Sequence, residues 1–448
     1  MSTFLYHTRA ILTLGLPIIG SHLAQMLLTV TDTVLLGRYG AGELAAVTIG
    51  GSAFFVVFIL GAGFGQAIMP LVAQAMGRGD ELRVRRDARM GMWLSLAYGL
   101  AVLPVFWTAG AWLSALGQTE DVARLGQQFL RIAGFGMVPA LLVMSLKSCL
   151  SGLGRTQVVL WVTLGGVALN LVVATGLIFG KWGLPEWGVR GAATATVVVQ
   201  WATFAALGVY AQYHPDLRRF RLFSRFWRPD WATLVSVFRL GLPVGITGLA
   251  ESGLFSAASV MMGWVGTVAL AAHGIAMQSA ALAFMVHLGL SNAATVLVGR
   301  AVGADDPQGL RDAGLVAVIL SALFAGLIIL VFLTLPGPIL NLFTDPAKPD
   351  TPAILAYGTV LLALAALFQL GDAMQVMALG LLRGIRDTAV PMWAAAVSYW
   401  VIGIPSSYAM GFVLGWKGVG VWLGLSVGLA LAAISMMVRF WMKAPRAV

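Results

Sequence analysis

Twelve apolar stretches of about 20 residues or more constrain this chain more than any other feature of its sequence. A helix needs about 20 mostly apolar residues to cross a bilayer. The stretches lie at 10–34, 44–76, 90–110, 126–146, 158–180, 191–211, 238–264, 268–299, 314–335, 353–381, 390–414 and 419–441. Only 10% of the 448 residues are charged, which is too few to cover a water-soluble globule. The sequence therefore predicts an all-α membrane protein with twelve transmembrane helices, and long runs without strand alternation exclude an outer-membrane barrel.

The chain also contains a tandem repeat. Leu14-Gly15-Leu16-Pro17 recurs as Leu240-Gly241-Leu242-Pro243, and laying 14–50 on 240–276 matches 14 of 37 positions. Six spans per repeat is an even number, so both repeats have the same orientation in the membrane. We expect two parallel six-helix lobes related by a pseudo-twofold axis along the membrane normal. The expected divisions are an N-terminal lobe at 1–211, a basic cytoplasmic linker at 212–237 and a C-terminal lobe at 238–448.

The basic residues orient the spans. With both termini inside the cell, 21 of the 28 Lys and Arg residues fall in inner segments, and the split follows the positive-inside rule. This count places Lys147 in an inner loop and leaves no basic residue within the apolar zone. The net charge of +10 therefore points to anionic lipid headgroups as the partner rather than to nucleic acid.

Three acidic residues remain inside the spans: Asp32, Glu251 and Asp372. A carboxylate in hydrocarbon is costly, so each is a candidate functional group; the alternative is a structural acid that is hydrogen-bonded in the bundle. Glu251 lies 12 residues after Arg239 and Asp372 lies 11 before Arg383, so both lie about 17 Å from the inner flank. We expect this pair to share a proton or to bind a monovalent cation such as Na⁺.

Other polar residues extend these candidates. His22, Gln25, Thr29 and Asp32 have helical spacing and form one stripe. The repeat breaks its symmetry here, because Glu251 aligns with Gln25, Asp32 with Ala258, and Asp372 with Ala140. We expect a substrate cavity lined by the following residues, with hydrogen bonding between helices as the alternative role for the buried polar ones: Gln25, Thr29, Asn170, Gln278, Asn292, Phe368 and Gln369.

Several short motifs together resemble the multidrug and toxic compound extrusion (MATE) transporters, over essentially the whole chain. They are the LGLP opening, Asp32-Thr33-Val34 followed by Gly37, Leu44-Ala45-Ala46, Ala271-Ala272-His273 and Gly384-Ile385-Arg386-Asp387-Thr388. Asp32, Glu251 and Asp372 are similar to the three membrane acids of the NorM-like branch. Phe368 departs from this pattern, because NorM-like members often have tyrosine there, whose phenolic oxygen phenylalanine lacks.

The resemblance implies a secondary antiporter of the bacterial inner membrane, monomeric and without cofactors, that exports cationic amphipathic compounds in exchange for Na⁺ or H⁺ by alternating access. A related lipid-linked oligosaccharide flippase is the alternative, for which we expect a cavity rich in Arg and Lys. A membrane-embedded enzyme is the third class, but no catalytic constellation is found at a span end, so we expect a protein that is not an enzyme.

Overall fold

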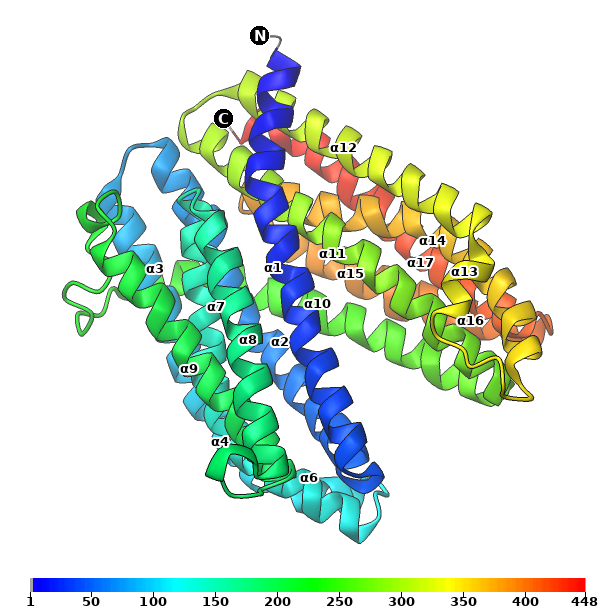
Figure 1. Cartoon of the computed structure of the whole chain (residues 1–448). Coiled ribbons are helices and arrows are strands. Elements are labelled where there is room, and N and C mark those ends of the chain that lie inside the picture. The colour runs from blue at the N-terminus through cyan, green and yellow to red at the C-terminus, as the bar shows by residue number, and fades with distance from the viewer. Residues whose placement is uncertain (1–2, 448) are drawn as a thin grey trace. The chain divides into compact units, whose positions relative to one another are not determined.

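The computed structural model describes residues 3–447, and every regular element in that range is helical. The first half contains α1 (Thr3–Tyr39), α2 (Ala41–Gly77), α3 (Glu81–Ala101), α4 (Leu103–Trp107), α5 (Ala109–Ala115), α6 (Glu120–Ala133), η1 (Gly134–Gly136), α7 (Met137–Gly152), α8 (Thr156–Phe179), η2 (Lys181–Gly183), α9 (Val189–Tyr213) and η3 (Arg218–Phe220). The second half contains α10 (Trp231–Val265), α11 (Thr267–Gly303), α12 (Pro307–Thr334), α13 (Pro336–Asn341), α14 (Thr351–Gly384), α15 (Ala389–Ala396), η4 (Val397–Gly403), α16 (Ile404–Tyr408), η5 (Ala409–Val413), α17 (Lys417–Lys443) and η6 (Ala444–Arg446) (Figure 1).

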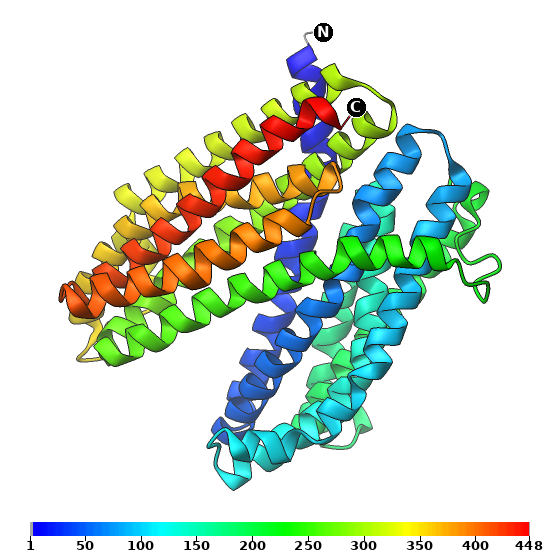
Figure 2. The same ribbon diagram turned by 180° about the vertical axis from the view of Figure 1, so that it is seen from behind.

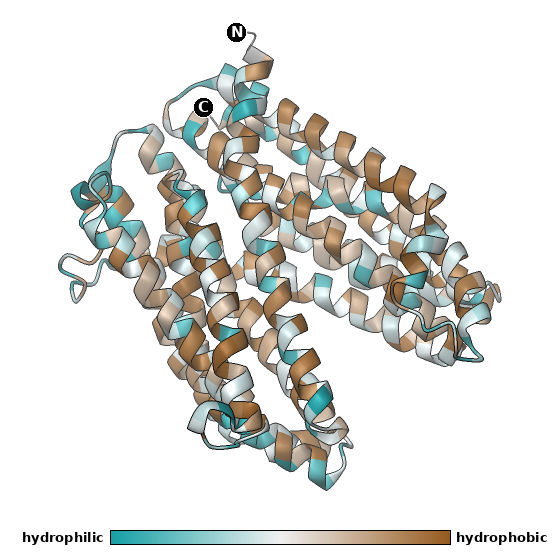
Figure 3. Ribbon diagram, viewed as in Figure 1, coloured by the Kyte–Doolittle hydropathy of each residue, from teal (hydrophilic) through white to brown (hydrophobic). Residues whose placement is uncertain are grey.

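Twelve helices in the described range are long and apolar enough to cross a membrane, which confirms the predicted fold class and number of spans. Most helices extend beyond the predicted apolar stretches. The third span begins at Glu81 rather than near residue 90, because Asp80 caps α3 by accepting the backbone N–H of Arg83 at 2.9 Å. Hydrophobic residues predominate along the helices, and hydrophilic residues are frequent at the helix ends and connections (Figure 3), as expected for helices that cross a membrane.

The structure comprises two compact units. We call Gly20–Gly245 the N unit; the C unit consists of Ile246–Val448 together with the start of the chain up to Ile19. Both boundaries fall inside a long helix, α1 or α10, two residues after the proline of an LGLP motif. The boundaries therefore differ from the expected lobe limits at 211/212 and 237/238.

Close contacts at two glycines explain why the first part of α1 belongs to the C unit and the first part of α10 to the N unit. In the C unit, a Cβ added at Gly289 of α11 would lie 2.9 Å from the backbone nitrogen of Ile19. In the N unit, a Cβ added at Gly63 of α2 would lie 2.5 Å from the backbone nitrogen of Gly245. Gly63 and Gly289 are separated by 226 residues, which is also the offset of the two LGLP motifs. The repeat therefore builds the same close backbone contact twice, once in each unit.

In the C unit, α11 and α14 pack with a constant register. The Ser291 hydroxyl donates to the Val376 carbonyl at 2.7 Å, and the Thr295 hydroxyl donates to the Gly380 carbonyl at 2.8 Å. Both pairs are 85 residues apart, so the two helices run parallel and each residue of α11 lies level with the residue 85 positions later.

The eleventh span is irregular. It consists of α15, η4, α16 and η5, of which η4 and η5 are π-helical, and it lies beside α17 in the C unit (Figure 2). Pro405 contributes to this irregularity, because it has no N–H to donate within the helix. Widened π-turns are frequent at functional sites.

The basic segment of the N unit is held against α3. Arg85 donates to the Phe220 carbonyl, Arg89 to the Arg225 carbonyl and Trp93 to the Phe226 carbonyl, at 2.8–3.0 Å. The expected linker at 212–237 is shorter in the structure, because α10 already begins at Trp231.

Asp230 supports that early start of α10. Its carboxylate accepts the backbone N–H of Thr233 at 3.1 Å and the Thr233 hydroxyl at 2.8 Å. Burial alone would raise the pKa of Asp230, but these hydrogen bonds and the nearby Arg86 and Arg83 outweigh it, so the pKa lies below its ordinary value.

Candidate functional site

The two acids of the second repeat both belong to the C unit. Asp372 on α14 is 1% exposed, and Glu251 on α10 is half-buried. The two carboxyl groups interact electrostatically with each other, and Glu251 also interacts with Arg383. Oδ1 of Asp372 and Oε1 of Glu251 are buried and have no hydrogen-bond partner among the described residues.

Further buried polar atoms of the C unit also lack a hydrogen-bond partner within the described part of the chain. Among them are the side-chain amide atoms of Gln369 and Gln375, Oη of Tyr399 and Nε2 of His287. A buried polar group without a partner costs about 1–3 kcal/mol. Clusters of such groups therefore call for an explanation, and a bound cation would satisfy the oxygens among them.

The cluster belongs to helices that pack on one another. Gln369, Asp372 and Gln375 have helical spacing on α14, and His287 of α11 lies level with Asp372 by the register of 85. Nδ1 of His287 makes a 2.9 Å hydrogen bond with the Ser321 hydroxyl, which fixes the ring. Asp372 therefore shares one face of α14 with two amide side chains and lies level with an imidazole of α11.

Phe368 lies one turn before Asp372 and is buried by aromatic rings. Its ring centroid lies 6.0 Å from that of Phe255 on α10 and 5.6 Å from that of Trp422 on α17. Trp422 donates through Nε1 to Nδ1 of His273 at 3.1 Å. Phe368 is 2% exposed and Gln369 is 0% exposed, so neither side chain faces an open cavity in this structure. Their predicted contact with substrate stays a prediction.

The acid of the first repeat has a partner. Asp32 on α1 accepts a hydrogen bond from the side-chain amide of Asn170 on α8 at 2.8 Å, within the N unit. Gln25 and Thr29 lie on the same helix and are exposed, whereas Asn170 is 1% exposed. The structure therefore brings two of the predicted N-terminal residues into direct contact, Asp32 and Asn170.

Lys147 corrects the predicted charge distribution. We expected it in an inner loop, but α7 continues past residue 146 to Gly152 and Lys147 is 9% exposed within it. It interacts electrostatically with His22 on α1. The prediction that no basic residue is buried in a span is thus wrong at this position, because the helix is longer than its apolar stretch.

The remaining candidates lie on α11 at other levels. By the register of 85, Gln278 lies nine residues before the level of Asp372, or about 13 Å along the helix axis. Asn292 lies five residues beyond it, or about 7 Å. The predicted contact of both residues with substrate stays a prediction.

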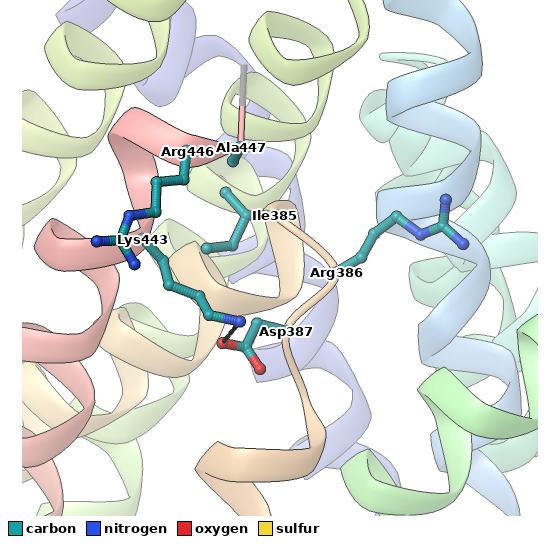
Figure 4. Close-up of a pocket in the computed structure, with 6 residues that line it drawn as sticks. All are labelled: Ile385, Arg386, Asp387, Lys443, Arg446 and Ala447. Carbon is teal, nitrogen blue, oxygen red and sulfur yellow. Dashed lines mark ion pairs between the residues drawn. The ribbon is translucent and has the colours of Figure 1, made fainter.

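A cavity of about 390 Å³ lies at the ends of α14 and α17. It is lined by Ile385, Arg386, Asp387, Lys443, Arg446 and Ala447 (Figure 4). Asp387 accepts from Nε of Arg439 at 2.7 Å and lies 3.3 Å from Nζ of Lys443. Arg386 points away from the other five residues. The charge of Asp387 is thus already neutralised by two bases, and these ion pairs hold the ends of α14 and α17 together. The cavity is separate from the polar cluster around Asp372.

Sequence reasoning missed Tyr399 altogether. The residue lies in an apolar span, where an aromatic side chain usually contacts lipid or a neighbouring helix. The sequence gives one indication of its role: a tyrosine, which carries a polar hydroxyl group, lies in the middle of a span that also contains Pro405.

Comparisons with known proteins show the family of the chain. The MatE family model matches residues 17–175 and 243–409. A relative from Agrobacterium fabrum called "Probable multidrug resistance protein NorM" is 45% identical over 437 residues, which cover 97% of this chain and 93% of the relative. A relative of the same name from Rhizobium meliloti is 45% identical over 435 residues, with the same coverage.

Solved structures match the fold. The eukaryotic MATE transporter AtDTX14 has a TM-score of 0.87 at 20% identity, over 99% of this chain and 98% of that one. A structure described as MATE in the bent conformation has a TM-score of 0.88 at 20% identity, over 100% and 98% of the two chains. The fold and the two matched repeats define a twelve-helix membrane transporter, not an enzyme. The chain belongs to the MatE family.

Proposed function

We propose that the chain is a secondary active antiporter that exports cationic amphipathic compounds in exchange for Na⁺ or H⁺ by alternating access. The observation that carries the proposal is the cluster of buried, unpartnered oxygens around Glu251 and Asp372 in the C unit. The name of the NorM relatives, multidrug resistance protein, supports export of several drugs rather than one metabolite.

The chemistry of the cluster fits a monovalent cation as the transported ion. Two carboxylates buried from water repel each other, and a cation between them removes much of that cost. Carboxylate and amide oxygens suit a hard cation such as Na⁺, and a proton bound to one carboxyl group would serve the same purpose. When the ion is bound, the site has less attraction for a cationic drug, so ion and drug oppose each other through one conformational equilibrium.

Asp32 has a different part in this proposal. Its hydrogen bond from Asn170 already satisfies one carboxylate oxygen, so we assign it to the N unit as a group that serves cationic substrate or ion there. Gln25 and Thr29, exposed on the same helix, stay candidates for contact with substrate.

We further propose that the protein is a monomer in the bacterial inner membrane. Both termini and the segment near Arg228 then lie in the cytoplasm. Single cysteines at Arg228 and at the exposed Lys348, in a Cys149→Ala background, test this orientation with an impermeant thiol reagent on intact cells. We expect Lys348→Cys to react and Arg228→Cys to react only after the membrane is opened. The reverse pattern contradicts the orientation.

Dye accumulation tests the export function. Expression in a pump-deficient bacterial strain should lower accumulation of ethidium-like dyes and raise resistance to cationic drugs. Asp372→Asn is the inactive comparison, and Glu43→Gln, which changes a partly exposed acid near the start of α2, is the matched control. Unchanged accumulation of several dyes, with the protein well expressed, contradicts the proposal. That result favours the oligosaccharide flippase, and the buried Lys147 is then the first residue to examine.

A further inference from the structure

The hydroxyl group of Tyr399 distinguishes this tyrosine from the others described in the C unit. Tyr399 is 0% exposed and its Oη has no hydrogen-bond partner among the described residues. Tyr6 and Tyr408 are exposed, at 60% and 51%, and Tyr357 accepts the backbone N–H of Gly418 at 3.1 Å. A buried tyrosine hydroxyl normally finds a partner, so an unpartnered one in this position points to a ligand.

The neighbouring residue ties the turn that contains Tyr399 to α10 next to Glu251. Trp400 donates through Nε1 to the carbonyl of Ala250 at 3.1 Å, and Ala250 directly precedes Glu251 on α10. The π-helical turn η4 is therefore fixed to α10 at the level of Glu251. Tyr399 also interacts electrostatically with both Glu251 and Asp372.

Amide oxygens of Gln369 and Gln375 are also available near Asp372, but the aromatic rings packed around Phe368 offer no oxygen. Phe368 and Phe255 are hydrocarbon rings, and Trp422 has an N–H that is already donated to His273. A sodium ion is a hard cation that prefers oxygen ligands. Two carboxylates supply charge, and a neutral oxygen completes the coordination without adding a further charge to the interior.

We infer that Tyr399 is an ion-binding residue, and that its phenolic oxygen is the neutral ligand of a Na⁺ site whose carboxylates are Glu251 and Asp372. The inference rests on the proposed antiport and specifies Na⁺, rather than H⁺, as the coupling ion. Tyr399 provides from η4 the phenolic oxygen that Phe368 cannot provide from α14. The widened turn at η4 and the nearby Pro405 explain how a residue of an apolar span presents its hydroxyl to the interior.

Sodium binding to the purified full-length protein tests this inference. Radioactive Na⁺ is bound to the detergent-solubilised protein at one fixed pH and displaced by unlabelled Na⁺, for the wild type and for Tyr399→Phe. The variant removes one oxygen atom and keeps the ring. We expect its affinity for Na⁺ to fall about tenfold, as for the loss of one bond to a charged group. Tyr408→Phe removes an exposed hydroxyl from the same span and should leave the affinity unchanged.

A second variant and a separate readout keep the outcomes distinct. If Tyr399→Phe does not give a monodisperse protein, Tyr399→His replaces it, and its ring nitrogen should also be a poor sodium ligand. Equal affinity of wild type and variant overturns the inference. Absence of saturable Na⁺ binding to the wild type overturns it as well, whereas the proposed export is judged separately by dye accumulation in cells.

Discussion

The N unit and the C unit contain the same close helix contact but differ in their buried polar groups. In each unit a helix start lies against a glycine, Gly63 or Gly289, at equivalent positions of the repeat. The N unit satisfies its acid, because Asn170 donates to Asp32. The C unit leaves oxygens of Glu251 and Asp372 without partners among the described residues.

This difference shows what duplication has kept and what it has changed. Close backbone packing tolerates no side chain at the two glycines, so the scaffold is repeated. Buried polar residues can differ between the two units, provided that each polar group has a hydrogen-bond partner or binds a ligand. The unit with unpartnered oxygens is therefore the one that we expect to bind the coupling ion, and the following changes test that division.

The largest effect is expected at Glu251. Glu251→Gln keeps the shape and removes the charge, so ion-driven dye efflux from proteoliposomes should fall to that of liposomes without protein. Glu43→Gln, at a partly exposed acid of the N unit, should transport like the wild type. Efflux by Glu251→Gln that still follows the imposed gradient contradicts the assignment of this acid to the ion site.

An intermediate effect is expected at Asn170. Asn170→Leu removes the hydrogen bond to Asp32. Because a hydrogen bond to a charged group contributes about 1.5–3 kcal/mol, the rate of efflux should fall about tenfold. Efflux should still follow the imposed gradient. Thr163→Val removes a neutral bond to Ser21 from the same helix, and its effect should be smaller. A complete loss of gradient dependence in Asn170→Leu would show that the two units do not divide their roles in this way.

The glycine contacts should respond alike in the two units. Gly63→Ala and Gly289→Ala each place a methyl group against backbone, and overpacking of this kind costs about 1–3 kcal/mol. The apparent melting temperature in detergent should fall by similar amounts for both. Gly51→Ala and Gly274→Ala, on the same helices with no atom within 4 Å of the added carbon, are the matched controls and should not lower it. A drop for only one member of the pair contradicts the shared scaffold.

The smallest effect concerns the first turns of two helices. α10 begins in the N unit behind the Asp230 cap, whereas α11 in the C unit follows Gly266 without a side-chain cap. Asp230→Ala should cost about 1 kcal/mol at neutral pH. Because the pKa of Asp230 is lower in the folded protein, this stabilisation is complete above the unfolded pKa of about 4 and disappears as pH falls through the folded pKa. Melting curves of both proteins against pH check this, and a difference that stays constant into strong acid contradicts it.

The sequence predicts much of this molecule because its constraints are local. Apolar length decides each of the twelve spans, and the cost of charge in hydrocarbon identifies Asp32, Glu251 and Asp372 as candidates. The contact between Asp32 and Asn170 joins residues 138 positions apart, so spacing alone does not predict it.

Other features depend on packing that the sequence does not display. The unit boundary inside α1 and α10 follows from backbone contacts at glycines, which a repeat alignment treats only as matches. Lys147 is buried because α7 continues beyond its apolar stretch. Tyr399 reaches the interior through a π-helical turn, whereas regular helical periodicity gives no reason to select it.

We expect the unpartnered acids of the C unit to couple transport to an ion, and the variant Asp372→Asn removes the charge of one of them. Dye efflux is measured from proteoliposomes under an imposed Na⁺ gradient and, separately, under an imposed pH gradient, together with dye binding to the same purified protein. We predict that Asp372→Asn binds dye but shows no efflux under the gradient that drives the wild type. Efflux by Asp372→Asn that follows the same gradient at the wild-type rate would show that this carboxylate does not couple transport to the ion.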